Sequence, residues 1–204
     1  MLIESESGIY VPVNKAQQSN VGYHFVSLLL LVLIIMLESY YGQSLFDSSL
    51  DFIVQVQEGA SDAKTTIWKL YSNLGLSAAV GLPPFLILMI YWDRLRTFYY
   101  VLVLTSMLFV MNVTKLWYHE PRPFWADDRI SAFDCNTQFG NPSGHSLFSM
   151  GVAINIWLDF FVSGTNKSLA ALPVWAKTIT LFVAVTFSFT IGYSRIFLGA
   201  HSWN

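Results

Sequence analysis

The chain has 204 residues, of which 54% are hydrophobic and only 12% are charged. Soluble proteins contain about a quarter charged residues, so this composition excludes an ordinary soluble domain and indicates a protein that crosses a membrane several times. The net charge of −2 and the absence of a Lys/Arg tract provide no electrostatic basis for binding nucleic acid.

Residues 1–20 are polar and lack the basic start and small-residue cleavage site of a signal peptide, so we expect a retained polar tail. A transmembrane helix needs about 20 mostly apolar residues. Runs of about this size cover residues 21–41, 67–92, 98–118, 146–162 and 174–197. The polar stretch at 43–64 favours a short helix at the membrane surface. We therefore predict an all-α, polytopic transmembrane helical bundle, with residues 21–204 as one membrane-embedded domain.

Three short polar clusters lie at the ends of apolar runs, and five alternating crossings place all three on the same side of the membrane. A single basic residue in such a position is more often an interfacial anchor, but three clusters on one side are difficult to explain as anchors. The clusters are Lys115 with Arg122-Pro123, Pro142-Ser143-Gly144-His145, and Ser194-Arg195 with His201.

The residue types in these clusters suit the binding of a phosphate ester. Lys115, Arg122 and Arg195 supply positive charge for the phosphoryl oxygens, and each guanidinium group offers two-point contact. Ser143 and Gly144 precede the fourth run, where the unpaired amides of a helix start attract an anion. The sequence therefore predicts a phosphate site at one membrane face.

Two histidines on this face allow the ester to be cleaved as well as bound. We assign attack on phosphorus to His201 and protonation of the leaving alcohol to His145. The first imidazole must then be neutral and the second charged, which predicts a bell-shaped rate profile. No metal and no other cofactor is expected, because a basic cluster of this kind argues against metal ligation by the acidic residues of its loop, Asp127, Asp128 and Asp134.

The three clusters resemble the signature motifs of the type 2 phosphatidic acid phosphatase superfamily, which includes lipid phosphatases, glucose-6-phosphatases and vanadium haloperoxidases. The resemblance covers the chain from Lys115 onward. It implies a helical fold, usually with six spans in the lipid enzymes, and metal-independent hydrolysis through a phosphohistidine. It also implies catalytic roles for His201, His145 and Arg195, and phosphate binding by Lys115, Arg122, Ser143, Gly144 and Arg195. The third motif of this family continues to an acidic residue four positions beyond the nucleophile, which would be position 205. Two interpretations follow: either this residue and a sixth span lie beyond Asn204, or the group that orients the His201 imidazole is absent.

We favour a phosphatase of a lipid phosphate monoester such as phosphatidate, acting at the lipid bilayer. The segment 122–125 and the position of Cys135 are also similar to glucose-6-phosphatases, so a small sugar phosphate is the alternative substrate. A non-catalytic member that binds phospholipid head groups is a further hypothesis. A channel or transporter is the remaining one, with a pathway lined by Lys69, Asn73 and Asn112.

Lys and Arg residues outside the clusters are more frequent on the side of the amino terminus. Cytosolic loops are enriched in these residues, so we predict a cytosolic amino terminus and a lumenal or extracellular site. This favours a multi-pass protein of the endoplasmic reticulum or the plasma membrane. The sequence contains no signal for a particular oligomeric state.

Overall fold

The structure is a computed structural model that describes residues 2–4, 10–12, 15–76, 94–162 and 167–203. The chain divides into two compact units, residues 1–44 and 45–204. In the first unit, strand β1 (Leu2–Glu4) pairs antiparallel with β2 (Tyr10–Pro12). Helix α1 (Lys15–Gln57) begins within the predicted polar tail and continues into the second unit. Its apolar side chains from Leu28 to Leu37 are exposed, as expected of a helix that faces lipid.

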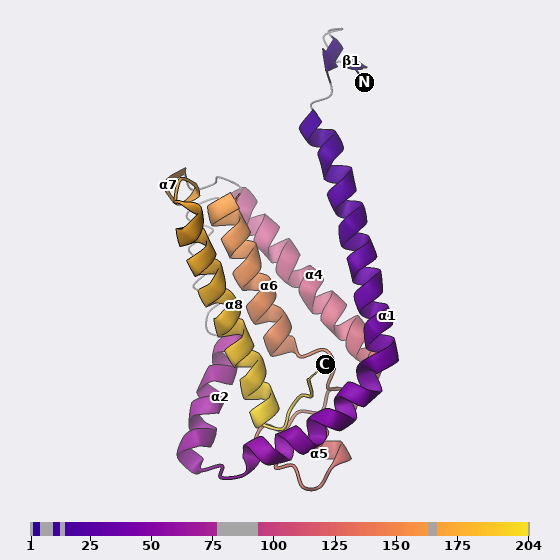
Figure 1. Cartoon of the computed structure of the whole chain (residues 1–204), viewed down its shortest axis with the longest axis vertical. Coiled ribbons are helices and arrows are strands. Elements are labelled where there is room, and N and C mark those ends of the chain that lie inside the picture. The colour runs from indigo at the N-terminus through magenta and orange to yellow at the C-terminus, as the bar shows by residue number, and fades with distance from the viewer. Residues whose placement is uncertain (1, 5–9, 13–14, 77–93, 163–166, 204) are drawn as a thin grey trace. The chain divides into compact units, whose positions relative to one another are not determined.

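The second unit is a bundle of helices (Figure 1). α6 packs against α4 and α8, and α2 packs against α6 and α8. A π-helical segment, η1, continues α6 at its carboxyl end. After the end of α1, the elements in chain order are α2 (Asp62–Leu76), α4 (Arg94–Tyr118), α5 (Pro123–Ala126), α6 (Gly144–Trp157), η1 (Leu158–Val162), α7 (Lys167–Ala170) and α8 (Val174–Phe197).

In the described part of the chain, four helical segments are long and apolar enough to cross a membrane: Leu28–Gln57, Arg94–Ala126, Gly144–Val162 and Val174–Phe197. Together with the helical bundle, they confirm the predicted fold class. The predicted span at 67–92 begins within α2, and its remainder at 77–92 lies outside the described residues.

The separate surface helix predicted over residues 43–64 is wrong. α1 runs through this stretch without a break to Gln57, and α2 begins at Asp62. The physical reason is that Phe46, Ser49 and Ile53, spaced three and four residues apart, form a buried helical face in the second unit. The chain turns only near Gly59, whose φ of 72° is a conformation that favours glycine.

The end of α8 is shaped by Gly199, which has a φ of 72°. Its N–H donates to the carbonyl of Ile196 at 2.9 Å, and the N–H of Ala200 donates to the carbonyl of Arg195 at 3.0 Å. A Cβ atom at Gly199 would lie 2.8 Å from the carbonyl oxygen of Ser131. Only glycine therefore fits this turn, which reverses the chain just before His201.

The side chain of Gln57 joins three segments of the second unit. Its Nε2 donates to the carbonyls of Ser131 at 3.0 Å and Phe197 at 2.9 Å, and its Oε1 accepts from the N–H of Ser131 at 2.8 Å. The Phe197 carbonyl is one of the last carbonyls of α8, which have no partner within the helix. Gln57 thus fixes the end of α8 and the 127–143 loop to the end of α1.

Candidate active site

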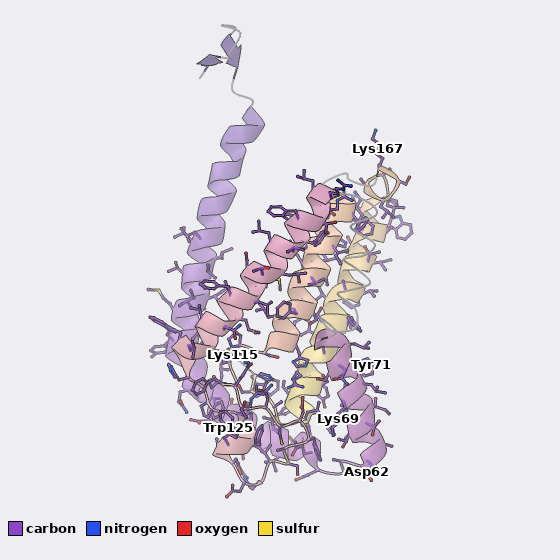
Figure 2. The ribbon with its side chains drawn as sticks, turned by 180° about the vertical axis from the view of Figure 1, so that it is seen from behind. Asp62, Lys69, Tyr71, Lys115, Trp125 and Lys167 are labelled. Carbon is purple, nitrogen blue, oxygen red and sulfur yellow. The ribbon has the colours of Figure 1, made fainter. Side chains whose placement is uncertain are left out.

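The three polar clusters meet at one end of the second unit. Figure 2 shows Lys115, Lys69 and Trp125 at this end, with Lys167 at the opposite end. Lys115 lies in the last turn of α4 and Arg195 in the last turn of α8, whereas the second cluster begins α6. Helix ends thus bring together residues that are far apart in the sequence.

The three cations of the site are buried: Lys115 is 5% exposed, and Arg122 and Arg195 are each 1% exposed. The Nζ atom of Lys115 donates to the carbonyl of Phe139 at 2.7 Å. Arg122 donates from Nε to the carbonyl of Gln138 at 2.6 Å, and from Nη1 to the carbonyl of Ala200 at 2.8 Å. Backbone carbonyls therefore orient the cationic groups without neutralising their charge.

The positive charge of this cluster exceeds the negative charge that is paired with it. Arg195 forms an ion pair with Asp134, but within the described ranges neither Lys115 nor Arg122 has a carboxylate partner. The Nε atom of Arg195 is also buried and has no hydrogen-bond partner there. Buried charge is costly unless it is paired, so the cluster is suited to receive an anion.

His201 is held as a neutral imidazole with one nitrogen available. Its Nδ1 lies 2.5 Å from the carbonyl oxygen of Gly140. A carbonyl only accepts hydrogen bonds, so Nδ1 carries a proton. A guanidinium only donates, so Nε2, which lies 3.4 Å from Nη1 of Arg122, faces this donor with its lone pair. Burial, and then the charges of Arg195, Arg122 and Lys115, lower the pKa of His201 well below its usual value.

The second cluster forms the start of α6. The Oγ atom of Ser143 accepts from the N–H of Ser146 at 3.4 Å and from the Ser146 hydroxyl at 3.1 Å. Both lone pairs of this oxygen are then used, and its own O–H remains to donate to an anion. His145, in the first turn, is 8% exposed and lies within electrostatic range of Arg195 and Arg122.

Gly144 lies at a close contact between two helices. A Cβ atom at this position would lie 2.7 Å from the Sδ atom of Met111, so α6 approaches α4 closely at this point. The sequence interpretation connected this glycine only with close approach to a ligand. The structure adds a contact with the protein itself, and the predicted binding of phosphate by Gly144 stays a prediction.

Glu120 and Gly140 are site residues that sequence reasoning missed. The carboxylate of Glu120 accepts from the hydroxyl of Ser202 at 2.7 Å and from Nδ2 of Asn141 at 3.3 Å. Its backbone carbonyl accepts from the N–H of Gly140 at 2.8 Å. Glu120 therefore binds Asn141 and Ser202, which directly follow Gly140 and His201 in the chain. In this way it holds the hydrogen bond between Gly140 and His201 in place. In the sequence Glu120 lies between Lys115 and Arg122, and this position was the one signal that could have identified it as a site residue.

Asp134 and Ser72 are the partners of Arg195. Nη1 of Arg195 donates to Oγ of Ser72 at 2.7 Å and forms an ion pair with the carboxylate of Asp134. From the sequence, Asp134 is predicted only not to bind a metal, and its pairing with Arg195 is not predicted. Among the described residues, no group of three or more His, Cys, Asp or Glu side chains is placed to hold a metal ion.

The fold and the site together define a multi-pass membrane protein with a positively charged, histidine-containing site at the ends of its helices. The sequence profile of the PAP2 superfamily matches residues 78–204, more than half of the chain, and the chain belongs to this superfamily. The resemblance noted from the three motifs is thereby confirmed.

A solved structure with the same fold is that of the first transmembrane PAP2 type phosphatidylglycerolphosphate phosphatase from Bacillus subtilis. The two chains are 22% identical and superpose with a TM-score of 0.62. The match covers 87% of this chain and 84% of the other. A comparison with curated proteins gives no match.

We predict that Glu120→Ala loosens the hydrogen bond that fixes the tautomer of His201. The substitution removes the acceptor of the Ser202 and Asn141 hydrogen bonds, which costs about 1–3 kcal/mol of folding stability. In ¹⁵N NMR spectra of the imidazole, the wild-type protein should show His201 protonated at Nδ1 alone, and Glu120→Ala should show a mixture of tautomers. Glu58→Ala, which alters an exposed glutamate in the turn after α1, is the matched control. An unchanged tautomer in Glu120→Ala would contradict the assigned role.

Proposed function

We propose that the protein is a metal-independent phosphatase that hydrolyses a lipid phosphate monoester through a phosphohistidine on His201. The observation that carries this proposal is the position of His201, whose Nδ1 contacts the carbonyl of Gly140 while its Nε2 lies beside Arg122 within a buried cluster that has surplus positive charge. Membership of the PAP2 superfamily and the likeness to a membrane phosphatidylglycerolphosphate phosphatase support a lipid substrate. The exposed apolar faces of the helices would give such a substrate access from the bilayer.

In the first step, phosphoryl oxygens bind Lys115, Arg122 and Arg195, and the lone pair on Nε2 of His201 attacks phosphorus. As the P–N bond forms, the P–O ester bond breaks and its electron pair goes to the leaving oxygen. His145 donates a proton to this oxygen, and the alcohol departs. The imidazole becomes positively charged, and its Nδ1–H remains bonded to the carbonyl of Gly140, which stabilises that charge.

In the second step, a water molecule attacks the phosphorus of the phosphohistidine. His145, now neutral, takes a proton from the water as the new P–O bond forms. The P–N bond breaks, His201 recovers its lone pair, and inorganic phosphate is released. In both steps the buried cations stabilise the charge on the equatorial oxygens of the transition state, where little water is present to screen it.

We further propose that residues 21–204 form the phosphatase domain and that its site faces the lumen or the outside of the cell. The excess of Lys and Arg on the side of the amino terminus supports this orientation. A small sugar phosphate remains the alternative substrate class.

We expect His201→Asn to abolish release of inorganic phosphate from phosphatidate by the purified full-length protein, with a loss of at least about 10³-fold because the nucleophile is removed. The matched control is His119→Asn, since asparagine tolerates the positive φ of 50° found at this position outside the cation cluster. Activity in His119→Asn should stay within about twofold of the wild-type value, and activity of the wild-type protein should persist in a chelator. Full activity of His201→Asn, or complete loss of activity in the chelator, would overturn the proposal.

The lowered pKa of His201 predicts where activity falls on the acid side. A lowered pKa keeps the imidazole neutral as the pH decreases, so kcat/KM should begin to fall only below 6.5, the ordinary pKa of histidine. In Lys115→Gln, the loss of a neighbouring positive charge should raise the pKa of His201. The acid limb of the profile, where kcat/KM falls with decreasing pH, should then move to higher pH. The ionisation of the substrate is common to both proteins, so the difference between their profiles reports on His201. An acid limb at the same pH in Lys115→Gln as in the wild-type protein, or one at lower pH, would contradict the account.

A further inference from the structure

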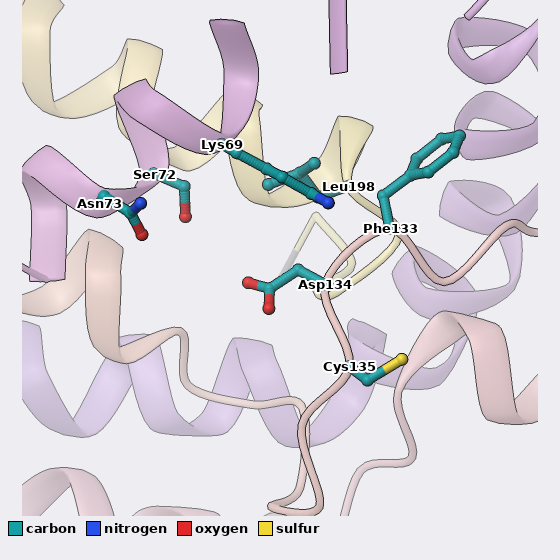
Figure 3. Close-up of a pocket in the computed structure, with 7 residues that line it drawn as sticks. All are labelled: Lys69, Ser72, Asn73, Phe133, Asp134, Cys135 and Leu198. Atoms are coloured by element: carbon teal, nitrogen blue, oxygen red, sulfur yellow. The ribbon is translucent and has the colours of Figure 1, made fainter. Parts of the chain in front are cut away.

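A polar pocket of about 250 Å³ lies beside Arg195 in the second unit (Figure 3). Three of its side chains come from α2, three from the loop before α6, and one from the turn after α8. They are Lys69, Ser72, Asn73, Phe133, Asp134, Cys135 and Leu198. Lys69, Ser72 and Asn73 share one face of α2 because they are three and four residues apart.

The pocket adjoins the proposed phosphate site. Two of its lining residues, Ser72 and Asp134, are the partners of the buried Arg195 guanidinium. Figure 3 shows Asp134 of the loop facing Ser72 and Asn73 of α2. A phosphoryl group bound to Arg195 would therefore lie next to this pocket.

The pocket lies on the side of the leaving alcohol. α2, which supplies three of its residues, approaches α6 so closely that a Cβ atom at Gly75 would lie 3.5 Å from the carbonyl oxygen of His145. His145 is the proposed proton donor to the leaving oxygen. His201, in contrast, is held by Gly140 and Arg122, neither of which lines the pocket. Since the backbone of His145 contacts α2, we expect an alcohol that departs toward His145 to depart on the side of α2.

The lining suits hydroxyl groups. The amide of Asn73 both donates and accepts, the carboxylate of Asp134 accepts, and Lys69 donates. Within the part of the chain that the structure describes, the side chains of Lys69 and Asn73 form no hydrogen bond with another residue, so both side chains are available to a ligand. Phosphoryl oxygens that bind Arg195 would compete with Asp134 for the guanidinium, and the displaced carboxylate would then need a new donor. A hydroxyl of the alcohol would supply one.

We propose that this pocket binds hydroxyl groups of the leaving alcohol and makes the protein selective for phosphate esters of polyols. The inference rests on the proposed function and names the substrate class of the same site. The favoured substrate carries a free hydroxyl on the carbon next to the ester-bearing carbon. Both an acylated glycerol phosphate and a small soluble polyol phosphate share this chemistry.

The test compares substrates that differ by one hydroxyl. Purified full-length protein is given 1-oleoyl-glycerol 3-phosphate or its 2-deoxy analogue in mixed micelles, and phosphate release is followed. The same comparison is made with glycerol 3-phosphate and its 2-deoxy analogue, which lack the acyl chain. The wild-type protein should favour the hydroxylated member by about tenfold in kcat/KM, the effect of one hydrogen bond. The pair with the higher kcat/KM identifies the lipid or the soluble compound as the source.

Two variants separate the pocket from the rest of the site. Asn73→Leu should reduce the ratio of kcat/KM values, hydroxylated over deoxy, to nearly one. Asn112→Leu is the matched control, because Asn112 lies on α4, outside the pocket, and among the described residues its side chain bonds only to the Leu108 carbonyl of its own helix, at 2.8 Å. It should keep the wild-type ratio. The wild-type comparison alone also tests the inference, whether or not Asn73→Leu folds.

The outcomes distinguish this inference from the proposed function. Phosphate release at equal kcat/KM from hydroxylated and deoxy substrates would overturn the polyol pocket and leave the phosphatase standing. A hydroxyl preference that persists in Asn73→Leu would also overturn it. Absence of phosphate release from all four substrates and from phosphatidate would overturn the proposed function itself.

Discussion

The structure of the site depends on one electrostatic constraint: three cations are buried together at the ends of helices, and the described residues pair them with a single carboxylate. Backbone carbonyls at 138, 139 and 200 receive the hydrogen bonds of Lys115 and Arg122 and leave the charge of these two cations in place. Lys115 and Arg195 lie in the last turns of their helices, where the negative end of the helix dipole favours a cation. The start of α6 faces the same cluster with the opposite end of a dipole and favours an anion. The arrangement therefore stabilises positive charge while reserving room for a negative ligand.

Several features outside the cation cluster serve to keep this geometry. The left-handed turn at Gly199 returns the chain toward the bundle, and Gln57 fixes both the end of α8 and the loop that carries Asp134. Glu120 then joins the two backbone segments between which His201 forms its hydrogen bond. The imidazole is thus positioned by neutral and anionic groups that lie behind its Nδ1, and its Nε2 faces the guanidinium of Arg122. This division lets one histidine stay neutral in a strongly positive environment.

Much of this was predictable from the sequence, because long apolar runs and clustered Lys, Arg and His residues are local signals. The helical bundle and the meeting of the three clusters followed from them. The continuation of α1 through residues 43–57 was not predictable, because its helical face is buried by distant parts of the chain. The hydrogen bond of His201 was not predictable either, because its partner is a backbone carbonyl, which every residue type has. Ser72 and Asn73 belong to a helix without a motif, so only the packing of α2 connects them with Arg195.

The central claim is that Lys115, Arg122, Arg195 and His201 form one cradle for a phosphoryl group in transit to an imidazole nitrogen. The most direct test is an experimental structure of the full-length protein with orthovanadate, an analogue of the pentacoordinate transition state. The account predicts vanadium bonded to Nε2 of His201, with its equatorial oxygens on the three cations and its distal oxygen toward His145. Vanadate bound elsewhere, or bound with Nε2 of His201 turned away from the metal, would contradict it.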